Sequence, residues 1–289
     1  MMKDGTRKTI TILLLLLTAG LLLFFSVRPV YLSAGPEAES LREAIREQKR
    51  IVHAAGALRT QAGEEEIYTN SLDALQNMYD AGNRFCEIDI RETSDGVLIC
   101  AHGDEAHLAN GSELPADAES GDFLSERLFG EFTPMTVEML AAFMHEHPDL
   151  TVITDAQGDN LRISKKLAEA WPELRDRFII QIYHESEYDP IRELGFQNLI
   201  YTLYRAADEE RNLWEIARFA EKHELVGITI QKEQFYSVKN RIAMAHCGLP
   251  FMFHTVDDAA EIEAMLRKPY VAAVYTNLTE EIHRGNAYS

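Results

Sequence analysis

Two carboxylates and two histidines lie close together in the first part of the chain, in a pattern suited to acid/base chemistry beside a metal ion. Glu87 and Asp89 alternate within the apolar run 85–90, so in a β-strand both side chains point to one face. A second apolar run leads to His102, and an earlier apolar pair leads to His53. An imidazole titrates near neutral pH, so His53 and His102 are candidates for proton transfer.

A third carboxylate, Asp155, ends the later apolar run 150–155. Together with Glu87 and Asp89 it would offer three hard oxygen ligands, which suit Mg²⁺ or Ca²⁺ better than zinc. The apolar neighbours of Glu87 and Asp89 favour burial, and buried carboxylates are costly unless they are paired or bind a metal. The alternative is a pair of exposed acids that form salt bridges.

Apolar, strand-like runs alternate with helix-like stretches across about 240 residues. Eight such strands with intervening helices predict a single (β/α)8 TIM barrel in the α/β class. A doubly wound open sheet is the alternative, but the sequence has no glycine-rich dinucleotide or phosphate loop to support it. The predicted strands are 51–53, 85–90, 150–155, 178–183, 199–204, 226–230, 251–254 and 271–275, and the predicted helices are 71–81, 136–146, 161–171, 208–224, 238–246 and 257–266.

In such a barrel the chemistry gathers at the carboxyl ends of the strands. Arg205, His254 and Asn277 follow later strands and are expected at the same end as the acids and histidines. The acidic, turn-rich stretch 103–134 interrupts the alternation directly after His102 and is predicted as an insertion. Long loops of this kind can be functional lids, and the alternative is a solvated excursion.

The N-terminus carries an uncharged, leucine-rich run over residues 9–27, preceded by Lys3, Arg7 and Lys8. Nineteen helical residues reach roughly 28 Å, close to the hydrocarbon thickness of a bilayer. We predict a cytoplasmic stub and transmembrane signal anchor over 1–30, a solvated helical linker over 31–50, and a barrel over 51–289 on the extracytoplasmic side of the cell membrane. The alternative is a cleaved signal peptide.

Composition narrows the classes of partner. The chain has 289 residues and a net charge of −19, which disfavours nonspecific binding to nucleic acid. Its three cysteines, an odd count in an exported domain, are expected to be free buried thiols. The sequence does not predict an oligomeric state.

The order of these motifs resembles that of the glycerophosphodiester phosphodiesterase family, which belongs with the phosphatidylinositol-specific phospholipase C-like barrels. The family pattern reads His-Arg-Gly, Pro-Glu-Asn-Thr, Glu-x-Asp, Asp-Gly, His-Asp and a later Glu-x-Lys. The resemblance covers roughly residues 51–280 and is most specific in the first half. The matching segments are His53-Ala-Ala-Gly56, Tyr68-Thr-Asn-Ser-Leu-Asp-Ala74, Glu87-Ile-Asp89, Asp95-Gly96, His102-Gly-Asp104 and Asp155-Ala-Gln157.

This resemblance implies a phosphoric diester hydrolase that acts on a glycerophosphodiester, a lipid head group or a related phosphodiester. It implies His53 and His102 as the acid/base pair, and Glu87, Asp89 and Asp155 as ligands of a divalent metal. The metal would polarise a phosphodiester oxygen and neutralise developing charge.

Two cations of the family pattern are missing. Ala54 and Ala55 replace the Arg of His-Arg-Gly, and Gln157 replaces the later Lys, while Thr69 replaces the Glu of Pro-Glu-Asn. We expect Arg205 to compensate as a phosphate-binding cation, with Gln157 and His254 also contacting substrate.

Two alternative functions remain open at this point. The first is a catalytically impaired barrel that serves as a binding module. The second is a barrel glycosidase, disfavoured because Glu87 and Asp89 lie too close together on one strand to face each other across a sugar.

Overall fold

The computed structural model describes residues 14, 17–18, 36–103, 113–206, 212–220 and 222–278. Within them, eight parallel strands pair in sequence, and β1 pairs with both β11 and β4, which closes the sheet into a barrel. Each strand falls at a position predicted from the sequence, so the (β/α)8 barrel is confirmed. The strands are β1 (Arg50–Val52), β4 (Phe85–Glu92), β6 (Thr151–Ala156), β7 (Phe178–Ile182), β8 (Leu199–Thr202), β9 (Gly227–Gln231), β10 (Phe251–His254) and β11 (Val271–Thr276).

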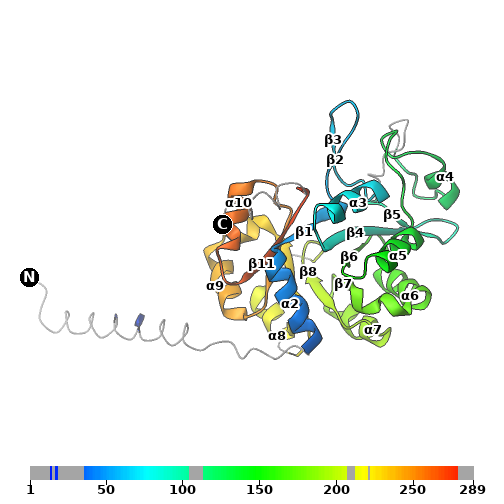
Figure 1. Cartoon of the computed structure of the whole chain (residues 1–289). Coiled ribbons are helices and arrows are strands. Elements are labelled where there is room, and N and C mark those ends of the chain that lie inside the picture. Colours follow the sequence, from blue (N-terminus) through cyan, green and yellow to red (C-terminus); the bar gives the residue numbers. More distant parts are fainter. Residues whose placement is uncertain are drawn as a thin grey trace, which may run out of the picture.

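Helices lie around the outside of these strands (Figure 1). Six of them match the predicted helical stretches, and the short α7 was not predicted. A broad apolar layer fills the space between helices and strands. The helices are α3 (Leu72–Asp80), α5 (Val137–Glu146), α6 (Asn160–Ala170), α7 (Tyr188–Glu193), α8 (Leu213–Ala220), α9 (Val238–Cys247) and α10 (Ala259–Leu266).

The barrel interior changes from apolar to polar along the strands. Ile153 of β6, Ile200 of β8 and Met252 of β10 belong to one buried cluster that draws residues from around the barrel. Because side chains on one strand face recur every two residues, the next inward positions are Asp155, Thr202 and His254. Polar side chains therefore collect at the carboxyl ends of the strands, which we call the mouth.

The helix α2 (Pro36–Gln48) closes the opposite end of the barrel. Ile45 is buried in the interior cluster, and Leu41 and Ala44 pack against it. Arg42 is also buried and donates to the carbonyl oxygens of Leu225 and Val226, just before β9. The helix was predicted, but the expectation that it is a solvated linker is wrong, because its apolar side covers the barrel floor.

The strand β4 extends beyond the barrel, and this extension carries the insertion. Near its start β4 pairs with β1, and further along it pairs with the antiparallel β5 (Leu98–Cys100). Residues 113–134 include α4 (Ser120–Ser125) and pack around their own apolar cluster, so the alternative of a solvated excursion is wrong for this part. The cluster comprises Ile99, Ala101, Leu114, Ala118, Phe123, Leu128 and Phe132.

The predicted transmembrane span, 9–27, lies outside the described residues except for Leu14, Leu17 and Thr18. No helix among the described residues combines the length and apolar character needed to cross a membrane. Cys86, Cys100 and Cys247 are free, and the first two are buried, as expected.

Candidate active site

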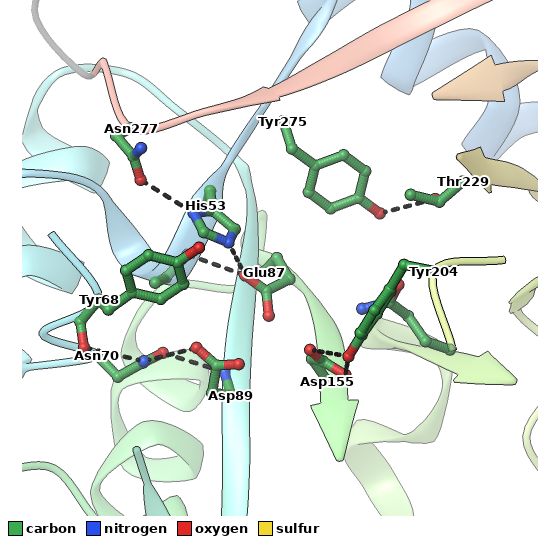
Figure 2. Close-up of polar contacts among 12 residues, drawn as sticks. His53, Tyr68, Asn70, Glu87, Asp89, Asp155, Tyr204, Thr229, Tyr275 and Asn277 are labelled. Atoms are coloured by element: carbon green, nitrogen blue, oxygen red, sulfur yellow. Dashed lines mark hydrogen bonds and ion pairs between the residues drawn. The ribbon is translucent and has the colours of Figure 1, made fainter. Parts of the chain in front are cut away.

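Three carboxylates meet at the mouth. Glu87 and Asp89 come from β4, and Asp155 comes from the neighbouring β6, where it stands in register with Asp89. One ligand oxygen from each lies within 4.8 Å of the others, and all three side chains are buried (Figure 2). The predicted acidic cluster therefore exists in the fold, and its spacing could hold a divalent cation.

This proximity makes the ionised carboxylates unfavourable without a cation. Burial, and then the charge of Asp155, raise the pKa of Glu87 to about 8. Burial and the charges of Glu87 and Asp155 also raise the pKa of Asp89 well above its usual value. The Oε1 atom of Glu87 is buried and has no hydrogen-bond partner among the described residues. An oxygen left in this state is suited to a metal ion.

Asp89 is oriented by two amide side chains. Asn70 donates to its Oδ2 at 2.8 Å and accepts from its backbone N–H at 3.0 Å. Gln157 donates to its Oδ1 at 2.7 Å and to Oδ2 of Asp155 at 3.1 Å. Asn70 itself has a left-handed backbone, with φ at 47°, at the turn before α3.

Asp155 is held by hydroxyl groups and a cation. The hydroxyl of Tyr183 donates to its Oδ1, and that of Tyr204 lies 2.8 Å from its Oδ2. Nη2 of Arg205 lies 3.3 Å from Oδ1, and the guanidinium stacks 4.3 Å from the centre of the Tyr183 ring. Arg205 thus lies beside the acidic cluster and forms an ion pair with Asp155.

His53 lies where β1 ends in the short 3-10 turn η1 (His53–Ala55). Ala54 and Ala55 have positive φ values of 47° and 62°, and the Ala54 N–H donates to Oε2 of Glu87 at 2.9 Å. The backbone turn thereby aims His53 across the mouth, with its Nε2 3.8 Å from Oε2 of Glu87.

The tautomer of His53 follows from a chain of hydrogen bonds behind it. Asn277 donates its Nδ2–H to Asp257 at 2.8 Å, so its Oδ1 faces the other way, 2.9 Å from Nδ1 of His53. That oxygen can only accept, which assigns a hydrogen to Nδ1 and leaves Nε2 as the nitrogen that faces the carboxylates.

His102 reaches the mouth because β5 replaces β1 as the partner of β4 beyond the barrel rim. Its ring and that of His53 both contact Tyr68, with ring centres 4.9 and 4.7 Å from the centre of the tyrosine ring. The two predicted acid/base residues are therefore brought to the same aromatic side chain.

An aromatic wall, formed by Tyr204, His254 and Tyr275, carries the remaining predicted residue. The His254 ring lies 5.5 Å from that of Tyr204 and 6.4 Å from that of Tyr275. Its Nε2 is buried and has no hydrogen-bond partner among the described residues. Burial, and then the nearby His53, lower the pKa of His254 to about 4, so it is neutral at pH 7.

All eight predicted site residues thus lie around the mouth, while several supporting residues were missed. Asn70 and Tyr68 belong to the segment that carried the family resemblance, yet neither was assigned a contact. Tyr183 and Tyr204 end predicted strands at inward positions, and that position was the available signal. The sequence gives no indication that Asp257 supports the site, because that role depends on Asn277 lying beside it in the fold.

Comparisons with known proteins identify the family and the fold. The model of the glycerophosphoryl diester phosphodiesterase family matches residues 61–281. No curated protein sequence matches the chain. Among solved structures, the glycerophosphodiester phosphodiesterase of Thermotoga maritima superposes with a TM-score of 0.62 at 16% identity, covering 82% of this chain and 97% of its own.

Two further structures share the fold at similarly low identity. A glycerophosphodiester phosphodiesterase from Parabacteroides distasonis has a TM-score of 0.60 at 17% identity, covering 82% of this chain and 96% of its own. An Oleispira antarctica phosphodiesterase, in complex with the product sn-glycerol-3-phosphate, has a TM-score of 0.59 at 13% identity, covering 83% of this chain and 96% of its own.

Proposed function

The chain belongs to the glycerophosphoryl diester phosphodiesterase family and is a phosphoric diester hydrolase, and we propose that it cleaves a glycerophosphodiester or a related head-group phosphodiester with a divalent metal ion and two histidines. The observation that carries the proposal is the meeting of His53 and His102 with three buried carboxylates at the barrel mouth. The product bound to the Oleispira antarctica relative supports a substrate of this class.

We propose Glu87, Asp89 and Asp155 as the ligands of Mg²⁺ or Ca²⁺. Three carboxylates and one unpartnered buried oxygen suit a hard cation, which would also offset the burial and the repulsion that raise the pKa values of Glu87 and Asp89. A bound divalent ion would polarise a phosphodiester oxygen and neutralise developing charge. Asn70 and Gln157 would hold Asp89 in place as a ligand.

His53 and His102 are proposed to move the protons. One imidazole accepts the proton of the attacking hydroxyl, from water or from the substrate's own neighbouring alcohol, as the new P–O bond forms. The other donates a proton to the leaving alkoxide as the old P–O bond breaks. For His53, Nε2 is the nitrogen available for this transfer, because Nδ1 is engaged by Asn277.

Arg205, Gln157 and His254 are proposed to contact the substrate. Arg205 is the cation beside Asp155 and would stand in for the two missing family cations at the phosphate. His254 is neutral and presents an unpartnered Nε2, which suits a hydrogen bond to a substrate oxygen or hydroxyl.

We further propose that residues 1–30 anchor the chain in the cell membrane and that the barrel, 51–289, lies on the extracytoplasmic side. The support is the uncharged run 9–27 and its preceding cations. Because α2 covers the end of the barrel opposite the mouth, a membrane span before residue 31 would attach on that side.

The full-length chain in detergent tests this function. Each of several glycerophosphodiesters and bis(p-nitrophenyl) phosphate is incubated with Mg²⁺, Ca²⁺ or excess chelator. We expect metal-dependent release of phosphomonoester or cyclic phosphate. His53→Ala should abolish it, and His145→Ala, an exposed histidine of α5, should retain it. Metal binding by calorimetry without turnover of any substrate would contradict the proposal and favour a binding module.

A further inference from the structure

Arg91 is a buried cation at the rim of the mouth that no catalytic step described above uses. It lies on β4 two residues beyond Asp89, so both side chains leave the same face of the strand. The residue is only 7% exposed, and it forms no ion pair with any described residue. A buried guanidinium needs hydrogen-bond acceptors, and those among the described residues are neutral.

Those acceptors are three backbone carbonyls at the two ends of one chain segment. Nη1 donates to the carbonyl oxygen of Gly103 at 2.7 Å and to that of Leu114 at 3.4 Å, and Nη2 donates to that of Pro115. Gly103 directly follows His102 and begins the insertion, whereas Leu114 and Pro115 lie further along it. One side chain therefore connects two separate places in the first part of the insertion to β4.

The bond to Gly103 fixes the backbone on the far side of His102. On the near side, the N–H of Ala101 donates to the carbonyl oxygen of Asp89 at 3.0 Å. The residues on both sides of His102 are thus hydrogen-bonded to β4. Ala101 donates to the main-chain carbonyl of Asp89, and Gly103 accepts from the side chain of Arg91. The same strand carries Glu87 and Asp89, so β4 sets the position of His102 relative to the acidic cluster.

We propose that Arg91 is a positioning residue for His102, an inference that rests on the proposed function. His102 lies beyond the last residue of β5, so the sheet alone does not fix its main chain. A displacement of about 1 Å in a catalytic group can lower the rate on the order of 100-fold. Arg91 prevents this displacement by holding Gly103, Leu114 and Pro115 together.

The test compares Arg91→Met and Arg91→Lys with a matched control in the full-length chain. Arg177 also donates to two backbone carbonyls, those of Met144 and His147, but lies before β7 at the end away from the mouth. Arg177→Met therefore removes similar bonds without touching the site. Thermal unfolding and calorimetric metal binding are measured for every variant.

We expect Arg91→Met to lower kcat by about 30- to 100-fold while KM and metal affinity change less than about twofold. Arg91→Lys, which can still donate to one or two carbonyls, should recover part of the loss. Arg177→Met should keep kcat within about twofold at a comparable loss of Tm. A kcat for Arg91→Met near that of the wild type, or a loss that only follows the folded fraction, would overturn the inference.

A readout that does not depend on turnover separates this inference from the proposed function. In spectra of ¹⁵N-histidine-labelled chain, the His102 resonance is assigned from its absence in His102→Ala. Arg91→Met should shift or broaden that resonance and leave His53 unchanged, whereas Arg177→Met should leave both unchanged. Absence of wild-type turnover would count against the function alone, and an unchanged His102 resonance in Arg91→Met would overturn the role of Arg91.

Discussion

Asp89 and Asp155 stand directly opposite each other in the register of two neighbouring parallel strands, and both side chains enter the mouth. This pairing builds the acidic cluster from regular sheet geometry rather than from a flexible loop. A site placed on paired strands keeps its ligand spacing fixed before the cation arrives. The cost is repulsion between buried carboxylates, which the cation would relieve.

The first prediction concerns Asp155. Asp155→Asn keeps the side-chain size and removes one of the three charges, so metal affinity should fall by more than about tenfold, and turnover should fall with it. Calorimetric titration with Mg²⁺ or Ca²⁺ measures the effect. Asp176→Asn, an exposed aspartate before β7, should bind metal like the wild type. Equal affinity in Asp155→Asn would exclude Asp155 as a ligand.

The second prediction is a pH dependence set by Glu87. Its pKa is about 8 in the metal-free fold, against an ordinary value of 4.5, so the folded chain retains a proton that the unfolded chain has lost. Stability of the metal-free chain should therefore fall as the pH rises from 4.5 towards 8 and level off above it.

The affinity for the metal should instead increase with pH, because the cation competes with the proton on Glu87. Apparent affinity should rise by up to about tenfold per pH unit between pH 6 and 8 for one displaced proton. Calorimetry in buffers of different ionisation enthalpy would count the protons released. An affinity that is constant over this range would show that no ligand is protonated in the metal-free chain.

The third prediction tests the hydrogen-bond chain behind His53. Asn277→Leu removes the acceptor for Nδ1 and should lower kcat by about 10- to 100-fold, with little change in metal affinity. Asp257→Asn should act in the same direction, because the Asn277 amide would no longer be oriented. Asp258→Asn is the matched control, since Asp258 only caps α10. Full turnover in both Asn277→Leu and Asp257→Asn would show that this chain does not position His53.

The fourth prediction concerns the aromatic wall. His254→Phe keeps a ring between Tyr204 and Tyr275 and removes Nε2, so KM should rise by about fivefold, as expected for one lost neutral hydrogen bond. The comparison is Tyr275→Phe, whose hydroxyl bonds Thr229 at 3.2 Å rather than facing substrate. A KM unchanged in His254→Phe would remove His254 from the substrate site.

Much of this fold could be predicted because the strand pattern is local. A run such as 150–155 shows its strand and its inward carboxylate through alternation alone, and parallel strands bring such residues to one end. The contacts that tune the site are not local. The hydroxyls of Tyr183 and Tyr204 reach Asp155 from beyond the ends of β7 and β8. The strand pattern places both side chains on the inward face but does not specify this contact.

The placement of α2 shows a different reason for a missed prediction. Its interleaved charges are typical of a solvated helix, but Leu41, Ala44 and Ile45 form a narrow apolar stripe. The stripe has a partner only once eight strands have closed and left an apolar floor. The sequence therefore predicted the helix, whereas its burial is a property of the assembled barrel.

The most direct test of the account is to follow one glycerophosphodiester by ³¹P NMR with the full-length chain, in Mg²⁺ or Ca²⁺ and in excess chelator. The account predicts that the diester resonance converts to a monoester or cyclic phosphate resonance only when a divalent metal is present. Conversion at the same rate in excess chelator would contradict the role given to Glu87, Asp89 and Asp155.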